Sequence, residues 1–257
     1  MKYVLITGGT SGIGYELARL FVINNYGIVI VSGNIEKLNA ADSKLKKEFS
    51  ANILTIEQDL SKLGAAKNIY DQINIMKIEI SILVNNAGVG LVGPVEEVNM
   101  QQDENMLILN IINLVELSKL FLPRMYQKKE GGILNVASTG AFQAGPYTST
   151  YYASKAFVLS FSKAIRYEAR EKGVKVCVLC PGATKTEFFQ RSGKKVPNSA
   201  MSAEKVASIA YKNFMNNKEI IVPGLVNKIF RWLPAKVKMI GLARFQMNLK
   251  KEYENLG

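Results

Sequence analysis

The sequence predicts a doubly wound α/β fold, in which helices cover both faces of a parallel sheet. Short apolar runs rich in Val, Ile and Leu alternate along the chain with longer segments whose apolar residues recur at helical spacing. The runs are continuously apolar rather than alternating with polar residues, which indicates strands buried on both faces. Ligands of such sheets bind beyond the carboxyl ends of the strands, so the residues that follow each strand are the ones to inspect.

The elements follow one another in a regular order. The expected strands are Tyr3–Thr7, Ile28–Ser32, Ile53–Glu57, Ile80–Asn85, Gly132–Ala137, Val174–Cys180 and a short Ile220–Val222. The expected helices run from the glycines after the first strand to about Asn24, then over Ile35–Phe49, Leu60–Met76, Met100–Gln127 and Thr150–Lys172. No repeat or linker interrupts this order, so we expect a single domain.

Composition excludes several classes of protein. The 257 residues are 48% hydrophobic, which disfavours disorder. The N-terminal apolar run is too short for a signal peptide, and no run reaches the roughly 18 to 20 uncharged apolar residues of a membrane span, so we expect a cytoplasmic protein. The net charge of +12 comes from Lys and Arg scattered among acids, without a nucleic-acid-binding motif, so no nucleic-acid partner is expected.

The chain contains no histidine, which removes His-based triads and most catalytic zinc sites, and no metal site is expected. Cys177 and Cys180 have the Cys-x-x-Cys spacing, but they fall in a predicted strand, where residues three apart face opposite ways. We therefore interpret them as buried structural thiols. Acid–base chemistry must use other side chains.

A glycine-rich turn follows the first strand and leads directly into a helix. Glycines at positions 8, 12 and 14 allow a tight turn and a close approach of backbone N–H groups to a pyrophosphate at the helix N-terminus. An ordinary strand-to-helix turn is the alternative. Asn85-Asn86-Ala87-Gly88 ends the fourth strand and is either a simple turn or a second ligand contact.

Tyr151 and Lys155 lie one helical turn apart, on one face of the helix after the fifth strand. A nearby ammonium favours the phenolate and lowers the pKa of the phenol toward neutrality, so the pair suits acid–base catalysis. The Ser138 hydroxyl, after the fifth strand, could hydrogen-bond a substrate oxygen. A solvated surface pair is the alternative for Tyr151 and Lys155.

These motifs together resemble those of the short-chain dehydrogenase/reductase family, from residue 2 to about 223. The matching residues are Thr7-Gly-x3-Gly-x-Gly14, Asn85-Asn-Ala-Gly88, Ser138, Tyr151-x3-Lys155 and Pro181-Gly182-x3-Thr186. The resemblance implies a Rossmann fold with a central seven-stranded parallel sheet, NAD(P)(H)-dependent interconversion of a carbonyl and an alcohol, and a homodimer or homotetramer. We place this domain at residues 1–224, followed by a basic amphipathic helical extension of it at 225–257.

The resemblance also implies residue roles. Tyr151 would be the general acid/base, Ser138 would orient the substrate oxygen, Lys155 would bind the nicotinamide ribose and lower the Tyr151 pKa, and Asn110 would hold a water of the proton relay. Tyr152 is a weaker rival for Tyr151. The residues expected to bind the cofactor are Gly8, Thr10, Ser11, Gly12, Ile13, Gly14, Ser32, Gly33, Asn34, Asp59, Leu60, Asn86, Ala87, Gly88, Tyr151, Lys155, Pro181, Gly182, Thr184 and Thr186. Asp59 is also a plausible helix cap.

The end of the second strand bears on the choice of cofactor. An acid there would accept hydrogen bonds from the NAD ribose and repel a 2′-phosphate. The segment Ser32-Gly33-Asn34 has neither that acid nor the Arg common in NADP-preferring members. Ser32, Asn34 and Lys37 could bind a phosphate, so we expect NADP(H) in preference to NAD(H).

Two segments bear on substrate and partners. By resemblance, residues 183–200 form a substrate-covering loop, in which Phe188 and Phe189 suit an apolar substrate or simply pack on the sheet. The tail from Leu225 to Lys251 has seven Lys or Arg and no acid, interleaved with apolar residues. It fits a helix on an anionic membrane surface, a cap over the active site or a subunit contact.

The motifs leave a second function open: a non-catalytic, dinucleotide-binding regulatory protein on the same scaffold. Degenerate members of that kind usually lose Tyr or Lys of the motif, and this chain retains both, together with Ser138 and Asn110. The sequence therefore favours the enzyme.

Overall fold

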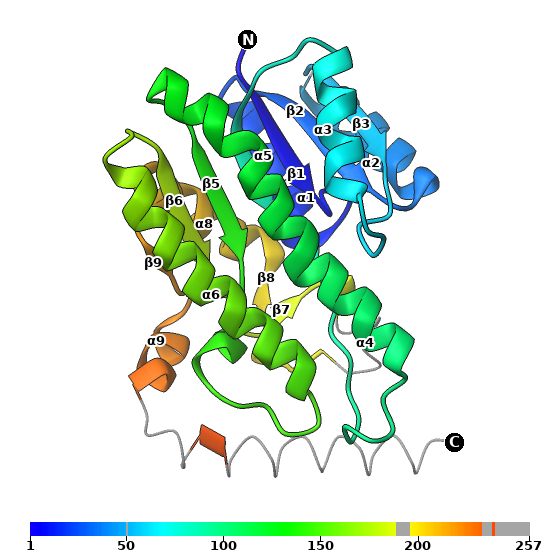
Figure 1. Cartoon of the computed structure of the whole chain (residues 1–257), viewed down its shortest axis with the longest axis vertical. Helices are drawn as coiled ribbons and strands as arrows, with labels where there is room; N and C mark the ends of the chain where they lie inside the picture. Colours follow the sequence, from blue (N-terminus) through cyan, green and yellow to red (C-terminus); the bar gives the residue numbers. More distant parts are fainter. Residues whose placement is uncertain (50, 189–195, 233–237, 240–257) are drawn as a thin grey trace.

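Seven parallel strands form the central sheet, in the order β3-β2-β1-β4-β5-β6-β9 (Figure 1). The computed structural model describes residues 1–49, 51–188, 196–232 and 238–239. The strands are β1 Tyr3–Thr7, β2 Gly27–Ser32, β3 Ile53–Glu57, β4 Ile80–Asn85, β5 Gly132–Val136, β6 Lys175–Leu179 and β9 Ile220–Ile221. The predicted doubly wound fold, with its seven-stranded parallel sheet in one domain, is confirmed. The strand order reverses between β1 and β4, where such sheets bind ligands.

Helices cover both faces of this sheet. They are α1 Gly12–Ile23, α2 Ile35–Phe49, α3 Ala65–Ile75, α4 Met100–Leu107, α5 Asn113–Lys128, α6 Ser149–Arg170, α8 Ala203–Met215 and α9 Leu225–Trp232. Buried residues of α1, α2 and α8 pack on one face, and those of α3, α5 and α6 pack on the other. In Figure 1 α5 and α6 cross in front of the strands.

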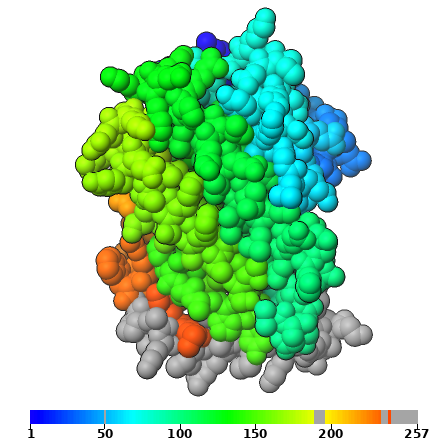
Figure 2. Space-filling view, viewed as in Figure 1, coloured from blue at the N-terminus to red at the C-terminus, as the bar shows by residue number. Residues whose placement is uncertain are grey.

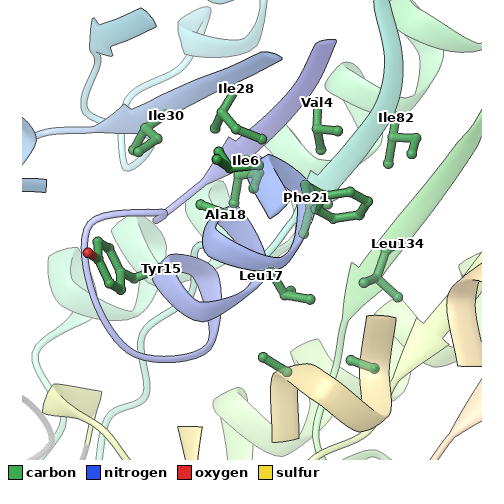
Figure 3. Packing of buried hydrophobic residues seen from close by; sticks show 14 of the residues in the cluster. Val4, Ile6, Tyr15, Leu17, Ala18, Phe21, Ile28, Ile30, Ile82 and Leu134 are labelled. Atoms are coloured by element: carbon green, nitrogen blue, oxygen red, sulfur yellow. The ribbon is translucent and has the colours of Figure 1, made fainter. Parts of the chain in front are cut away.

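Successive residues of each strand supply the two cores in turn. Ile6 faces α1, where it joins Phe21 and Leu134 in one cluster, as Figure 3 shows. Leu5 faces the other way and packs in a second cluster with Phe121. Both faces of the strand are therefore buried, which explains the continuous apolar runs in the sequence.

Three local features differ from the predicted elements. Helix α3 begins at Ala65 rather than Leu60, because the Asp59 carboxylate accepts a hydrogen bond from the Ser61 N–H and Gly64 then turns at φ +78°. The long helix predicted from Met100 is interrupted by a π-helical turn, η1, at Ile108–Ile112. Helix α8 and a two-stranded sheet of β7 (Thr184–Lys185) and β8 (Met201–Ser202) were not predicted.

The continuous helical segment Met100–Lys128 is long and apolar enough to span a bilayer by length and composition alone. Leu117, Phe121 and Met125 on this segment are buried in the core on the sheet. Their burial explains the hydropathy of the segment, because the core helix of a globular protein has the same composition.

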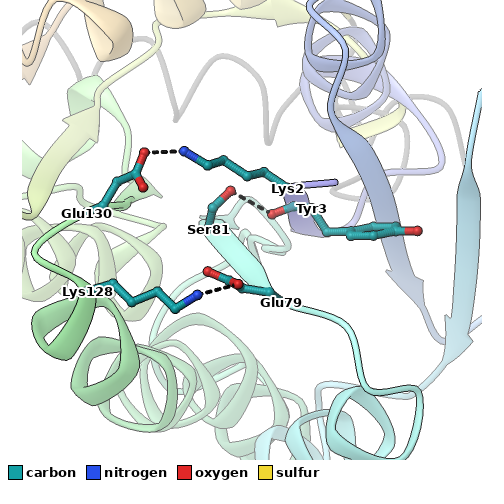
Figure 4. A network of polar contacts seen from close by, with 6 residues as sticks. All are labelled: Lys2, Tyr3, Glu79, Ser81, Lys128 and Glu130. Atoms are coloured by element: carbon teal, nitrogen blue, oxygen red, sulfur yellow. Dashed lines mark hydrogen bonds and ion pairs between the residues drawn. The ribbon is translucent and has the colours of Figure 1, made fainter.

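Ion pairs join the elements at the amino end of the sheet. Lys2 pairs with Glu130, Lys128 pairs with Glu79, and the Ser81 hydroxyl donates to the Tyr3 carbonyl (Figure 4). The charged groups are exposed, so each pair contributes little to stability. This end of the molecule lies opposite the carboxyl ends of the strands.

A buried row of polar side chains crosses the middle of the sheet. The Asn85 amide donates to Asn135 Oδ1 at 2.9 Å and to the Ser118 hydroxyl at 3.3 Å, and the Asn135 amide donates to the Ser162 hydroxyl at 2.9 Å. Asn135 and Ser118 are fully buried. The row links α5, β4, β5 and α6 through groups that have no access to water, so each group depends on the next.

We expect Asn135→Ala to lower the free energy of unfolding by about 2–3 kcal/mol, because it leaves an Asn85 N–H unsatisfied in the core. Urea-induced unfolding followed by circular dichroism measures the change. Asn68→Ala is the matched control, since Asn68 is exposed on α3. Equal stability of the two variants would show that the row does not stabilise the fold.

Candidate active site

The glycine-rich turn after β1 packs closely against the end of β4. Gly8 and Gly12 have φ of +64° and +55°, which L side chains rarely adopt. A Cβ at Gly14 would lie 2.4 Å from both the Gly8 carbonyl oxygen and the Asn86 side-chain nitrogen. The glycines are therefore needed because β1, α1 and β4 pack too closely to one another here for a side chain, and not only because the turn needs flexibility.

Thr7 and Asn86 hold this approach together. The Asn86 side chain donates to the carbonyls of Thr7 and Gly8, each at 3.0 Å. The Thr7 hydroxyl accepts from the N–H groups of Asn86 and Ala87, each at 3.0 Å. Asn86 therefore fixes the turn, which is a structural role that the sequence did not distinguish from ligand binding.

The N-terminus of α1 opens from this turn. Ser11 is the N-cap, yet its side chain makes no capping hydrogen bond. The N–H groups of the first turn, with Ile13 among them, lack intrahelical partners and lie at the positive end of the helix dipole. Thr10, Ser11 and Ile13 are partly exposed there. This arrangement fits the pyrophosphate of a dinucleotide.

The ends of β2 and β3 lie side by side. A Cβ at Gly33 would lie 3.2 Å from the Asp59 Cα, so no larger side chain fits there without movement. Asn34 Oδ1 caps α2 by accepting from the Lys37 N–H at 2.8 Å, and the Ser32 hydroxyl accepts from the Asn34 N–H at 3.3 Å. Asp59 does not cap α3, because the N-cap of that helix is Gly64; its carboxylate accepts from the Ser61 N–H in the turn that precedes the helix. The Leu60 side chain is buried in the core.

The segment after β6 covers both of these regions. Thr186 lies against the glycine turn, where a Cβ at Gly12 would be 2.7 Å from the Thr186 methyl group. Glu187 forms an ion pair with Lys37 at the start of α2. Pro181 accepts a hydrogen bond from the Thr139 N–H, and Thr184 is buried in β7. Sequence reasoning missed the Lys37–Glu187 pair, because no local pattern joins residues 150 positions apart.

Asn110 lies on the π-helical turn η1 and is buried. Its side chain accepts from the Val89 N–H at 3.1 Å, and donates to the Val89 carbonyl at 3.0 Å and to the Ser154 hydroxyl at 3.1 Å. Ser154 in turn donates to the Tyr151 carbonyl at 2.7 Å. The polar chain therefore connects Asn110 to the helix that carries Tyr151, through a serine that the sequence did not single out.

Tyr151, Ser138 and Lys155 converge beside this chain. The Ser138 hydroxyl is close enough to the Tyr151 hydroxyl to lower the pKa of the phenol. The Lys155 Nζ lies 5.9 Å from the centre of the Tyr151 ring, and a Cβ at Gly88 would be 3.1 Å from that Nζ. Lys155 is 4% exposed and donates to the Val136 carbonyl at 3.0 Å. The structure therefore brings together the four residues expected to be catalytic, and their roles stay predictions.

Burial dominates the electrostatics of this group. It raises the pKa of the Tyr151 phenol well above its usual range, and the Ser138 hydroxyl works against that rise. Burial also lowers the pKa of Lys155 to about 8. The expected lowering of the Tyr151 pKa by Lys155 is not seen, because the lysine donates to Val136 rather than to the phenol. In this state Tyr151 is protonated at neutral pH.

An aromatic ring and a small cavity of mixed lining lie beside Tyr151. The Phe188 ring centre lies 5.5 Å from that of Tyr151, and a Cβ at Gly90 would be 2.9 Å from the Phe188 ring. A small cavity beside Tyr151 is lined by both apolar and polar residues. They include Leu91, Val95, Val98 and Met106, together with Asp103, Ser149 and Thr150. Phe189, which was predicted with Phe188 to line the site, lies outside the described residues.

Two further predictions concern the cysteines and the tail. Cys177 and Cys180 are both buried and unpaired, which confirms the interpretation as structural thiols. Burial raises the pKa of the Cys177 thiol to about 11. Residues 225–232 of the tail form α9, and residues 233–237 and 240–257 lie outside the described part of the chain.

Comparison with known proteins decides the family. The family model for short chain dehydrogenases matches residues 2–197. The chain belongs to the short-chain dehydrogenase family. It is 28% identical to a mouse (Mus musculus) very-long-chain 3-oxoacyl-CoA reductase, over 99% of this chain and 84% of that one. It is 31% identical to mouse 17-beta-hydroxysteroid dehydrogenase type 3, over 77% of this chain and 65% of that one.

A solved structure is similar over nearly its whole length. It is a short-chain dehydrogenase from Sphingobium yanoikuyae in complex with NADPH, with a TM-score of 0.83 and 27% identity, over 96% of this chain and 95% of that one. This short-chain dehydrogenase is therefore an oxidoreductase that acts on CH–OH and C=O groups with a nicotinamide dinucleotide.

We expect Lys155→Met to stabilise the ligand-free protein at pH 7. The difference between the usual lysine pKa of 10.5 and one of about 8 corresponds to roughly 3 kcal/mol of unfavourable burial. Above pH 8 the folded lysine loses its proton while the unfolded one keeps it, so the stability of the wild type rises with pH toward 10.5.

Thermal unfolding at pH 7 and pH 9.5 measures this effect. The difference in melting temperature between Lys155→Met and the wild type should be smaller at pH 9.5 than at pH 7. Lys163→Met, at an exposed position on the same helix, should have the melting temperature of the wild type at both pH values. An equal difference in melting temperature between Lys155→Met and the wild type at both pH values would contradict the lowered pKa of Lys155.

Proposed function

We propose that this enzyme reduces an apolar ketone or aldehyde to the alcohol with NADP(H), and that Tyr151 gives the proton. The observation that carries the proposal is the convergence of Ser138, Tyr151, Lys155 and Asn110 at the carboxyl ends of the strands, beside a helix N-terminus free to bind a pyrophosphate. The bound nicotinamide dinucleotide supplies the hydride. The relatives named for 3-oxoacyl-CoA reduction and hydroxysteroid dehydrogenation support a carbonyl on a largely apolar substrate.

The protonation of Tyr151 favours reduction. Its raised pKa keeps the phenol protonated at neutral pH, so it donates to a carbonyl oxygen that gains negative charge. The Ser138 hydroxyl orients and polarises the same oxygen. Lys155, once its ammonium turns from the Val136 carbonyl to the nicotinamide ribose, compensates the charge left on Tyr151.

Proton resupply follows the buried polar chain. The Asn110 side chain is fixed by two hydrogen bonds with the Val89 backbone, one through its oxygen and one through its nitrogen. The same nitrogen also donates to the Ser154 hydroxyl. Asn110 is a positioning residue that holds a water between Lys155 and solvent. Its place on a π-helical turn supports this role, because such turns recur at functional sites.

Lys37 is the residue that we propose selects NADP(H). It is the cation nearest in sequence to Ser32, Gly33 and Asn34, and a side chain at Gly33 would have to displace Asp59 by a few tenths of an ångström. Lys37 is partly exposed and pairs with Glu187, so a 2′-phosphate would replace that carboxylate as its partner.

The assembly and location of the enzyme are also proposals. We infer a homodimer or homotetramer, supported by the exposed aromatic residues Phe157 and Tyr167 on α6. We infer a cytoplasmic location, with contact to a membrane surface through the basic tail.

Tyr151→Phe should lower kcat at least 100-fold while the Kd for NADPH changes little, because only the proton donor is lost. Tyr152→Phe is the matched control, because its ring still packs against Gly140 and Gly145. Consumption of NADPH with a panel of apolar ketones measures kcat, and fluorescence titration measures Kd. Full activity of Tyr151→Phe would disprove the role of Tyr151.

Lys37→Ala should weaken NADPH binding about 10-fold or more, because a charge-assisted hydrogen bond is worth roughly 1.5–3 kcal/mol. Binding of NADH should not change. Glu187→Gln should tighten NADPH binding by removing the competing carboxylate, and Lys47→Ala, on the last turn of α2, is the control. Titration of both dinucleotides measures the affinities, and equal effects on NADPH and NADH would overturn the role of Lys37.

A further inference from the structure

Helix α9 presents its apolar side to solvent. Leu225, Val226, Ile229 and Trp232 are 72%, 78%, 58% and 80% exposed. Their spacing of one, three and three residues places them on one face of the helix. A surface helix normally turns that face toward the core, but no described residue covers this patch, which we call the α9 face.

The opposite side of α9 carries Asn227, Arg231 and Phe230, which are partly buried against the body of the protein. The Asn227 side chain donates to the Pro223 carbonyl at 2.7 Å and lies where a Cβ at Gly182 would be only 2.5 Å from it. The Arg231 guanidinium lies 5.0 Å from the centre of the Phe142 ring. These contacts fix the orientation of the helix, so the exposure of the α9 face is built into the fold.

The α9 face lies at the substrate end of the molecule. Arg231 contacts Phe142, the last residue of a short 3₁₀ turn (Thr139–Phe142) whose N-cap is Ser138. Lys238 is 6% exposed, and its Nζ donates to the Phe142 carbonyl at 2.9 Å, so the chain contacts the same point again after α9. Figure 1 shows α9 at the end toward which the arrows of β5 and β6 point, and Figure 2 shows it in orange at the molecular edge.

Charge decides which partner fits the α9 face. Lys228 is exposed at its border, and Arg231 lies 5.3 Å from the Trp232 ring. Residues 225–251 contain seven basic side chains and no acid. Two copies of the chain paired symmetrically through this face would bring like charges together. An anionic lipid surface instead attracts the cations, accepts the apolar side chains and suits a tryptophan at headgroup depth.

We propose that the α9 face docks this enzyme on the surface of an anionic lipid bilayer, with the 3₁₀ turn that follows Ser138 turned toward the membrane. Resting on the proposed function, the docking gives access to apolar carbonyl compounds dissolved in the bilayer. They would pass α9 and the 3₁₀ turn to reach Ser138 and Tyr151.

The first test measures docking alone, with the full-length chain and no substrate. Vesicles of phosphatidylcholine with 30% phosphatidylserine should sediment the protein at low salt, and pure phosphatidylcholine vesicles should sediment much less. Trp232 is the sole tryptophan of the chain, so its emission should shift to shorter wavelength on binding. An unshifted emission and an unchanged supernatant would overturn the proposal.

Substitutions within the face provide the control. Val226→Ser with Ile229→Ser should lower the partition coefficient at least 10-fold, and Ile75→Ser should not change it. Ile75 is 79% exposed at the end of α3, so it is an equally exposed apolar residue away from the α9 face. Vesicle binding that persists in the double variant would overturn the role of α9. A wild-type dimer that the double variant dissociates, without vesicle binding, would show that a second copy covers the face.

The last measurement separates docking from catalysis. With NADPH, the double variant should reduce a small water-soluble ketone like the wild type, but reduce a long-chain ketone held in anionic vesicles several-fold more slowly. Equal loss on both substrates would contradict delivery through the membrane. If the wild type reduced neither ketone, the proposed function would fail, while the vesicle binding of the α9 face would still stand.

Discussion

The contact between the glycine-rich turn and the end of β4 is the constraint on which the rest of the site depends. Gly14 approaches both Gly8 and Asn86 so closely that a methyl group would not fit between them. Asn86 then ties the first and fourth strands together through two carbonyls. This contact sets the N-terminus of α1 next to Asn86, and Gly88, two residues further on, lies directly against Lys155 and Asn110. The expected pyrophosphate site and the expected acid–base group therefore share one rigid support.

The burial of Lys155 is a cost that the folded protein carries for this arrangement. Lys155 is 4% exposed, and its ammonium is held by a backbone carbonyl rather than by a carboxylate of the described residues, so its pKa falls to about 8. The same burial raises the pKa of Tyr151. The pair is thus set with both protons in place at neutral pH, which suits a proton donor rather than a base. To compensate charge on Tyr151, Lys155 must move its ammonium away from the Val136 carbonyl. The ligand-free geometry therefore differs from the geometry of proton transfer by this one side-chain movement.

Elements that depend on the composition of their own segment were predicted from the sequence. Features that depend on contacts between residues far apart in the sequence were not. The apolar composition of strands such as Ile80–Asn85 predicts them directly. Gly8 and Gly12, which adopt positive φ, likewise predict the turn after β1. The positions of Ser138, Tyr151 and Lys155 follow from strand order, because the carboxyl ends of parallel strands share one edge. The π-helical turn at Asn110 comes from one extra residue in a helix, and Ser154 acquires its role only from Asn110 across a 44-residue separation. The sequence of α9 predicted an amphipathic helix. Which face of that helix is exposed to solvent depends on the packing of Asn227 against Gly182.

Three consecutive residues connect parts of the site that are otherwise far apart. Thr186 lies on the glycine turn, Glu187 pairs with Lys37, and Phe188 packs on Tyr151 and Gly90. Because these residues are adjacent, one short stretch of backbone contacts the glycine turn, the start of α2 and Tyr151. Loss of one exposed ion pair costs little, since such pairs contribute about 0–1 kcal/mol. A charged group at Lys37 can therefore displace Glu187 readily, and this contact lies within three residues of backbone from the ring of Phe188 that packs on Tyr151.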